Sequence, residues 1–197
     1  MSVEKAMEDR YSSRKYLDKP IEKEKLDLIL KSGQLCPSTF GLEPVRFVVV
    51  RPASLLYEAC FSQPSLQTAD IAIVYASSIK RLEPHGPSAM EHFRRTGLDI
   101  QAQIDDFEPF YRLLESKGRL ESWARSQAYI PATAMCIQAS ELGIQSCILE
   151  GIDEDLVKKA CKLDSDELVN LVVVFGYPAD KPYPRLRRSI EELARTL

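Results

Sequence analysis

Hydrophobic and polar positions follow two different periods along the first part of the chain. Residues 21–35 carry apolar or small side chains at i, i+3, i+4 and i+7: Leu26, Ile29, Leu30 and Gly33. This spacing predicts an amphipathic helix that is entered through Pro20. The β-branched runs at 45–51 and 69–77 predict strands, and the turn residues of 36–44 predict a loop before the first strand.

The second half of the chain is more apolar and predicts buried elements. Residues 123–142 are apolar on almost every side, which indicates a helix buried in a core or a subunit interface, with a kink or a late start at Pro131. A short strand is predicted at 145–151, followed by a helix that Asp153 caps. Residues 167–178 form the most apolar strand, which we expect at the centre of a sheet covered on both faces.

Two further stretches are polar and rich in proline. Residues 78–120 are interrupted by Pro84, Pro87 and Pro109 and carry scattered aromatic residues, so they are predicted to form helices that lie on another element. After residue 178, further prolines hold an extended arm, and Ser189 begins a capping-box pattern for a last short helix. The arm needs a surface, which a partner chain could provide; the alternative is a solvated tail.

Length and composition limit the classes of protein that need to be considered. The chain has 197 residues, of which 45% are hydrophobic and 28% charged, and is predicted to form a single domain over residues 1–197. Its net charge of −3 argues against a dedicated nucleic-acid binder. The first residues lack the apolar centre of a signal peptide, and no apolar run would span a bilayer. We therefore expect a cytoplasmic protein with no membrane partner.

Several kinds of catalytic site are disfavoured by the residues present. The eight glycines are scattered, which excludes G-x-G-x-x-G and the P-loop. The five cysteines never form C-x-x-C, and Gly86 and Pro87 separate His85 from His92. Disulfides, a metal site and a Ser–His–Asp triad are therefore poorly supported. An enzyme without these side chains points toward a bound cofactor that carries the chemistry.

Two basic clusters are candidates for binding an anion. In the segment "RYSSRKY", Arg10, Ser12 and Arg14 occupy alternate positions, so an extended backbone would place them on one face that suits a phosphate or carboxylate. A solvated basic stretch is the alternative. The arm carries a second cluster, at Arg185, Arg187 and Arg188, again with cations at alternate positions. The two clusters could converge on one dianionic phosphate, which sequence spacing alone does not establish.

Four segments, taken together, resemble the successive signatures of the FMN-dependent nitroreductase family, in the family's order: "RYSSRKYLDKPI", "LCPSTFGLEPVRFVVV", "WARSQAYIPATAMCIQASELGIQSCILEGID" and "LVVVFGYPADKPYPRLRRSIEEL". The resemblance covers nearly the whole chain apart from residues 78–120. It implies an α+β fold, a three-layer sandwich with a mixed, mainly antiparallel sheet flanked by helices and a C-terminal arm that extends over the partner subunit. It also implies a homodimer with two FMN sites, each built from both chains.

The resemblance assigns roles to individual residues. It implies that the FMN phosphate and ribityl chain bind to Arg10, Ser12 and Arg14, and that Arg185 and Arg187 complete the phosphate site. The residues that would approach the flavin from the partner subunit lie in one loop: Pro37, Ser38, Thr39, Phe40 and Gly41. This loop departs from the commoner P-S-x-x-N-x-Q-P-W form at Gly41, Glu43 and Val45 and matches an F-G-L-E-P variant.

The remaining matched residues would surround the isoalloxazine ring. Ser62 matches a position that binds the pyrimidine edge, and Ser65 is a weaker match nearby. The backbone of Leu149, Glu150 and Gly151 would lie against the flavin, with the Glu150 N–H directed at N5. Taken alone, Glu150 is a carboxylate at the end of a strand. Phe40 and Phe110 are candidates for the substrate pocket.

The function implied is an FMN-dependent oxidoreductase that works by ping-pong. NADH or NADPH would give hydride to flavin N5, and a small electron-poor acceptor such as a nitroaromatic or quinone would then be reduced, with no essential side-chain acid or base. Three alternatives stay open: a related reductase of an enone, a halogenated compound or free flavin; a flavin-storage or sensing protein; and a dimeric scaffold without cofactor. The sequence does not distinguish the acceptor or the nucleotide.

Overall fold

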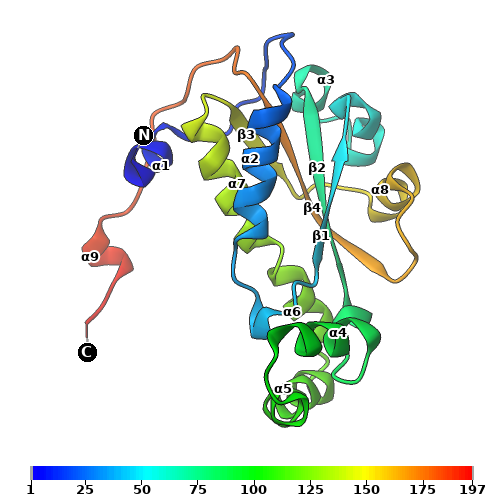
Figure 1. Cartoon of the computed structure of the whole chain (residues 1–197). Helices are drawn as coiled ribbons and strands as arrows, with labels where there is room; N and C mark the ends of the chain where they lie inside the picture. The colour runs from blue at the N-terminus through cyan, green and yellow to red at the C-terminus, as the bar shows by residue number, and fades with distance from the viewer. Residues whose placement is uncertain (1, 197) are drawn as a thin grey trace.

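The centre of the molecule is an antiparallel sheet, shown in Figure 1 for a computed structural model that describes residues 2–196. Its strands lie in the order β1-β2-β4-β3. They span Val45–Val50 (β1), Ile71–Ser78 (β2), Gln145–Leu149 (β3) and Glu167–Gly176 (β4). All four predicted strands are thereby confirmed, and each pairs antiparallel with its neighbours.

The two central strands are apolar because both of their faces are covered. Every residue of β2 is buried, and β4 is buried along most of its length. Alternate side chains point to opposite faces, so Val74 and Val174 belong to one core, whereas Tyr75 and Phe175 belong to the other. The prediction of a central, doubly covered strand at 167–178 is confirmed.

Two long helices cover one face of the sheet: α2, Lys23–Gln34, and α7, Tyr129–Glu141. They approach closely at Gly33, where an added Cβ would lie 2.0 Å from the Met135 methyl carbon. Helix α7 begins two residues before Pro131, so the proline occupies the first turn, where its missing N–H breaks no helical hydrogen bond. The late helix start predicted from Pro131 is confirmed.

The other face is covered by short elements and by α8, Glu154–Cys161. They include α3, Ser65–Thr68, and 3₁₀ turns at Ala53–Leu56 and Glu58–Cys60. Asp153 caps α8 by accepting a hydrogen bond from the Leu156 N–H, as predicted.

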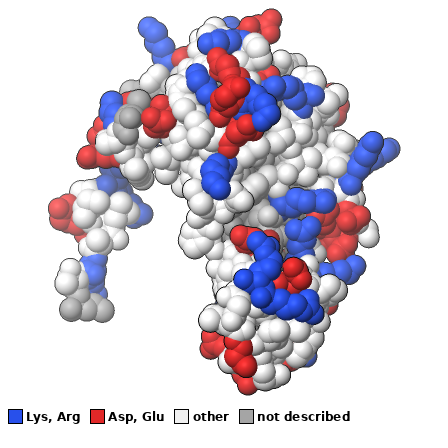
Figure 2. All heavy atoms as spheres, viewed as in Figure 1, with Lys and Arg blue, Asp and Glu red and all other residues white. Residues whose placement is uncertain are grey.

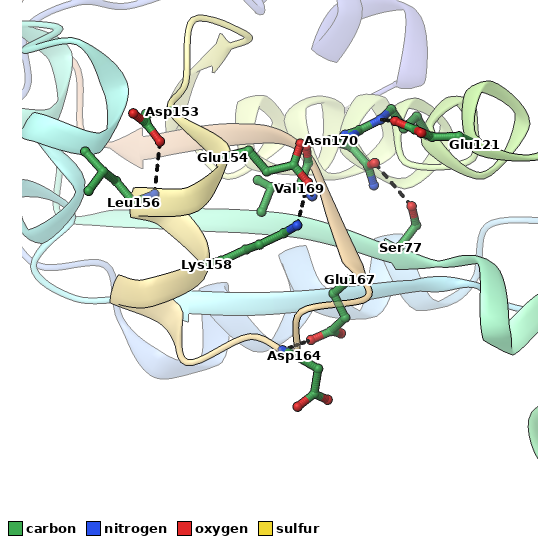
Figure 3. A network of polar contacts seen from close by, with 11 residues as sticks. Ser77, Glu121, Asp153, Glu154, Leu156, Lys158, Asp164, Glu167, Val169 and Asn170 are labelled. Atoms are coloured by element: carbon green, nitrogen blue, oxygen red, sulfur yellow. Dashed lines mark hydrogen bonds and ion pairs between the residues drawn. The ribbon is translucent and has the colours of Figure 1, made fainter.

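A polar network fastens α8 and α6, Leu120–Ser126, to the backbone of β4 (Figure 3). Glu154 accepts hydrogen bonds from the Val169 N–H and from Lys158, each at 3.0 Å. Arg125 of α6 donates to the Val169 carbonyl at 2.8 Å and pairs with Glu154 at 2.9 Å. The network thus joins two helices that lie far apart in sequence to one position of the sheet.

A helical lobe with its own core lies at one end of the sheet (Figure 1). It contains a 3₁₀ turn at Ile79–Leu82, α4 at Pro87–Thr96 and α5 at Ile100–Ser116. The helices predicted for 78–120 are confirmed, but the expected interruption at Pro109 is wrong, because α5 continues through it. Pro109 is exposed, whereas Phe107 and Tyr111 on either side are buried, so packing of the aromatic face holds the helix across the missing hydrogen bond.

The two ends of the described chain lie on the same side of the molecule. A helix that the sequence analysis did not predict, α1 at Val3–Asp9, packs against α7. The C-terminal arm runs past α1 and ends in α9, Ile190–Leu193, which has the predicted capping box at Ser189. In Figure 2 the end of the arm stands apart from the body of the molecule. Within residues 2–196, no helix has the length and apolarity needed to cross a membrane.

Candidate functional site

The "RYSSRKY" segment lies along the free edge of β3. Ser12 forms an isolated parallel bridge with Ser146, which is the one parallel pairing beside the antiparallel strands in residues 2–196. The Ser13 N–H donates to the Ser146 carbonyl at 3.3 Å, and the Tyr11 N–H donates to Gln145 Oε1 at 3.0 Å. The segment is therefore extended, as the anion-site hypothesis requires.

Alternate side chains of this segment have different surroundings. Ser12 and Arg14 are exposed and Arg10 is half-buried, whereas Ser13 is completely buried. Among residues 2–196, no hydrogen bond or ion pair engages the guanidinium group of Arg10 or Arg14. Two cations without a carboxylate partner, with a hydroxyl between them in sequence, form a donor set that suits a phosphate.

The cations of this segment act on the thiol groups beneath it. Burial raises the pKa of Cys147 above the usual thiol value, and the charges of Arg14 and Arg10 oppose that rise. Cys147 is 7% exposed and Cys136 is 2% exposed, so both pack as small hydrophobic residues.

Part of the second basic cluster reaches the first. Arg185 of the arm donates to the Met7 carbonyl at 2.8 Å and also to the carbonyl of Arg10. A cation bound to the last carbonyls of α1 interacts favourably with the helix dipole. Arg187 instead donates to the carbonyl of its neighbour Leu186, and its side chain is exposed. The structure thus brings Arg185 to the first cluster, but not Arg187.

The end of β3 forms a second part of this edge. Leu149 is buried, and the chain emerges at Glu150, whose carboxylate accepts a 2.7 Å hydrogen bond from the Tyr129 hydroxyl. The Gly151 carbonyl accepts a 3.0 Å hydrogen bond from the Gln63 side chain. The neighbouring Ser62 is exposed and has a positive φ of 55°.

Ser65 is the matched polar residue with the least exposed side chain. It begins α3 and is only 3% exposed. The weak match that suggested it as a ligand residue receives no support from its position.

The loop at 37–41 is held by a different set of contacts. Thr39 donates to Gln127 Oε1 from both its N–H and its hydroxyl, each at 3.0 Å, and accepts from Trp123 Nε1 at 3.3 Å. Pro37 begins this loop, and Ser38 accepts a 2.9 Å hydrogen bond from the Glu43 N–H. These bonds attach the loop to the junction of α6 and α7.

Phe40 and Gly41 both have left-handed backbone conformations, with φ of 53° and 69°. The strained Phe40 places its half-exposed ring 4.9 Å from Phe107 and 5.8 Å from Phe110, measured between ring centroids. Phe40 and Phe110, the two residues proposed for a substrate pocket, are therefore in contact. Helix α5 of the helical lobe holds the Phe40 ring.

A cavity of about 600 Å³ opens beside the loop, between α2 and β1. Pro37 and Ser38 contribute to its lining, together with apolar side chains such as Leu30 and Phe47. Figure 2 shows a largely uncharged, hollowed strip between α2 and the helical lobe, with Lys and Arg side chains at one margin. The volume lies within the range of small-molecule pockets.

Within one chain, the predicted residues other than Ser65, Phe110 and Arg187 fall into two groups. The β3-edge group comprises Arg10, Ser12, Arg14, Ser62, Leu149, Glu150, Gly151 and Arg185. The loop group comprises residues 37–41. The junction of α6 and α7 lies between them, since Gln127 binds the loop and Tyr129 binds Glu150. Figure 1 places α1 and this loop at opposite ends of the α2–α7 layer.

The sequence analysis missed the residues that hold both groups in place. Gln127 and Tyr129 lie in the stretch read as a buried apolar helix, and Gln63 follows a short turn. A signal was available for Gln127 and Tyr129, because both place polar groups at the start of an otherwise apolar stretch. Gln63 had no such signal, because its partner Gly151 is distant in sequence.

Solved structures with the same fold are known. A protein of Bacillus subtilis, ydfN, described as a nitroreductase, superposes with a TM-score of 0.83 at 20% identity and covers 98% of both chains. A protein of Exiguobacterium sibiricum, described as a nitroreductase in complex with FMN, gives a TM-score of 0.81 at 20% identity, covering 100% of this chain and 98% of the other. The fold is therefore the α+β nitroreductase fold that the resemblance implied.

The sequence comparison identifies the family. Residues 7–177 match the model of the Nitroreductase family. A Staphylococcus epidermidis protein whose name places it among the NAD(P)H nitroreductases is 30% identical over 194 residues, covering 89% of this chain and 87% of the relative. This chain belongs to the nitroreductase family.

Proposed function

We propose that this protein is an FMN-dependent NAD(P)H oxidoreductase of the cytoplasm that reduces a nitroaromatic, a quinone or a similar electron-poor acceptor by ping-pong. The observation that carries this proposal is the pair of arginines on the β3 edge, Arg10 and Arg14, whose guanidinium groups have no partner in residues 2–196. The names of the relatives support the nucleotide, and the FMN bound in the E. sibiricum protein supports the cofactor.

The residues of the β3-edge group fit the two ends of FMN. Arg10, Ser12 and Arg14 would bind the phosphate and ribityl chain, because the two guanidinium groups have no hydrogen-bond or ion-pair partner in residues 2–196 and Ser12 is exposed. At the other end of β3, the backbone N–H groups of Glu150 and Gly151 would face the ring, where a glycine permits close approach. The chemistry that bound FMN supplies is hydride transfer at N5, first from NAD(P)H and then to the acceptor.

A homodimer would complete each site with the loop of the partner subunit. Two features support this: within one chain the loop group lies at the opposite end of the α2–α7 layer from α1, which leads into Arg10 (Figure 1), and the arm exposes large apolar side chains. Tyr183 is 83% exposed, Leu186 85% and Ile190 72%. Several large apolar side chains exposed on one segment are typical of a surface that contacts a partner. In the dimer, Pro37, Ser38, Thr39 and Gly41 would approach the flavin, with Phe40 and Phe110 beside the acceptor.

Absorption spectroscopy tests this function directly. The protein is reconstituted with FMN, desalted, and measured before and after anaerobic addition of NADH or NADPH. Retained flavin that bleaches, and recovers with a nitroaromatic, is the expected result. Retained flavin that never bleaches would favour storage or sensing, and loss of all flavin would contradict the proposal.

The acceptor is a separate question that needs parallel assays. Turnover of a nitroaromatic, a quinone, an enone, a halogenated compound and free flavin would be compared in one series with both nucleotides. We expect the nitroaromatic or the quinone to give the highest kcat/KM. A preference for the enone or for free flavin would place the protein among the alternative reductases.

A further inference from the structure

The residues between the cations of "RYSSRKY" converge on one aspartate of the arm. Asp180 accepts a hydrogen bond from Ser13 Oγ at 2.6 Å through one carboxylate oxygen, and from the Arg14 backbone N–H at 2.7 Å through the other. The Tyr11 hydroxyl donates to the Asp180 backbone carbonyl at 2.9 Å. Tyr11 and Ser13 occupy the positions that alternate with Arg10, Ser12 and Arg14. Asp180 therefore holds the intervening side chains and leaves the cations free.

Backbone pairings lead the arm to this point. Tyr16 forms an antiparallel bridge with Pro178, and the Leu17 N–H donates to the Tyr177 carbonyl at 2.8 Å. The Ala179 N–H then donates to the Lys15 carbonyl, also at 2.8 Å. Asp180 is the next residue, and among residues 181–196 only Arg185 forms a hydrogen bond with the first cluster.

The charge of Asp180 is balanced by neutral donors. Burial would raise the pKa of its carboxyl, but the hydrogen bonds from Ser13 and from the Arg14 N–H outweigh burial and lower the pKa below the usual value. No lysine or arginine of residues 2–196 forms an ion pair with it. The Asp180 carboxylate is thus ionised. It forms no ion pair with either arginine cluster within residues 2–196, although it accepts a hydrogen bond from the backbone of Arg14.

We propose that Asp180 is a positioning residue for the phosphate end of the cofactor site. It holds residues 11–14 extended, so that Arg10, Ser12 and Arg14 face outward together, and it fixes the start of the arm, so that Arg185 reaches Arg10. It does not contact the cofactor. This inference rests on the proposed function, because it concerns the same site.

A positioning role and a purely electrostatic role of Asp180 predict opposite changes in phosphate affinity for Asp180→Asn. The substitution keeps the side-chain size but removes a negative charge near a site for a dianion, which on electrostatic grounds alone would tighten phosphate binding. It also replaces one acceptor oxygen with an NH₂ group, which cannot accept from Ser13 or from Arg14. If Asp180 positions the cations, the variant binds phosphate more weakly.

The experiment compares FMN with riboflavin, which lacks the phosphate. Dissociation constants are measured by flavin fluorescence for the full-length wild type and for Asp180→Asn. We expect the FMN constant to rise roughly tenfold or more, the effect of losing one hydrogen bond to a charged group, while the riboflavin constant changes less than about twofold. Tighter or unchanged FMN binding, or equal weakening for both ligands, would overturn the inference.

Asp70→Asn is the matched control. Asp70 also accepts from a backbone N–H, that of Ile21 at 2.7 Å, and from Arg51 at 2.7 Å, but it lies outside the β3-edge group. Its variant should leave the ratio of the two flavin constants unchanged. If Asp70→Asn changes that ratio as much as Asp180→Asn does, the effect is a general loss of stability and the inference fails.

Two further measurements keep the test decisive. Ser13→Ala removes one donor to Asp180 without changing charge, and should weaken FMN binding in the same direction by a smaller factor. Hydrogen exchange at the Arg14 amide reports the contact without any flavin: exchange should accelerate in Asp180→Asn and not in Asp70→Asn. A wild type that binds FMN no better than riboflavin would count against the proposed function, whereas unchanged exchange at Arg14 would count against the role of Asp180.

Discussion

Two segments of this chain carry cations at alternate positions, and they are held to very different degrees. Residues 10–16 are fixed on one side by the edge of β3 and on the other by Asp180. Within residues 2–196, the side chains of 185–188 are attached to the body of the molecule through Arg185 alone, and Leu186 is 85% exposed. Alternating charge becomes a defined binding surface only where the side chains between the cations are anchored.

Removing the free guanidinium groups should produce the largest effect. Arg10→Ala and Arg14→Ala each delete a charge-assisted donor, which is worth about 1.5–3 kcal/mol, or roughly a 10- to 100-fold rise in the FMN dissociation constant. Fluorescence titration measures this rise. Arg188→Ala, on the loosely held segment, is the matched control and should change the constant less than about twofold; an equal loss there would show that both segments act only through net charge.

The next largest effect, on the free energy of unfolding, is expected when the space beneath residues 10–16 is filled. An added Cβ at Gly176 of β4 would lie 2.8 Å from the Tyr16 ring, so Gly176→Ala must displace a buried side chain. Overpacking of this kind costs about 1–3 kcal/mol of the free energy of unfolding. Urea denaturation at constant m-value measures it, and unchanged stability would mean that Tyr16 moves freely and that the segment is not fixed.

Removing one buried hydroxyl group, that of Tyr16, should cause a smaller loss in the free energy of unfolding. Tyr16, which is 4% exposed, donates to the Ser13 carbonyl at 2.8 Å, so Tyr16→Phe should lower the free energy of unfolding by about 1 kcal/mol. Tyr183→Phe on the exposed arm serves as the control, and thermal denaturation of both variants should separate them. If both variants lowered Tm equally, residues 10–16 would be held no more firmly than the arm.

The smallest effect should be the pH dependence that Asp180 confers. Its pKa is lower in the folded protein than in the unfolded chain, so its contribution to stability is present above the unfolded value, about 3.9, and is lost as pH falls through the folded value. Comparing Tm between pH 3 and pH 6 should show a flatter profile for Asp180→Asn than for the wild type. Parallel profiles would mean that its hydrogen bonds do not favour the ionised form.

The sequence predicted the layered part of this fold well, for a physical reason. Strand β4 and helix α2 bury continuous or periodic apolar surface, and such patterns are local. The interruption expected at Pro109 does not occur, because the buried Phe107 and Tyr111 hold α5 in place on either side of the proline. Helix α1 was missed because only Ala6 of its residues is buried.

The candidate site was predicted through its charged residues and not through their supports. Arg10 and Arg14 stand out because cations at alternate positions are visible in seven letters. Asp180 gives no such signal, since an aspartate between two prolines of an extended arm resembles a solvated residue. Its role depends on a contact between the two ends of the chain, and the sequence pattern of either end contains no information about that pairing.

The bridge between Ser12 and Ser146 has a consequence for self-association. An edge strand such as β3 presents unpaired N–H and C=O groups, which can recruit strands of other molecules into aggregates. Here the "RYSSRKY" segment lies over part of that edge and surrounds it with positive charge. The same residues that would hold a cofactor thus also shield the sheet, so variants that release this segment should aggregate before the core itself unfolds.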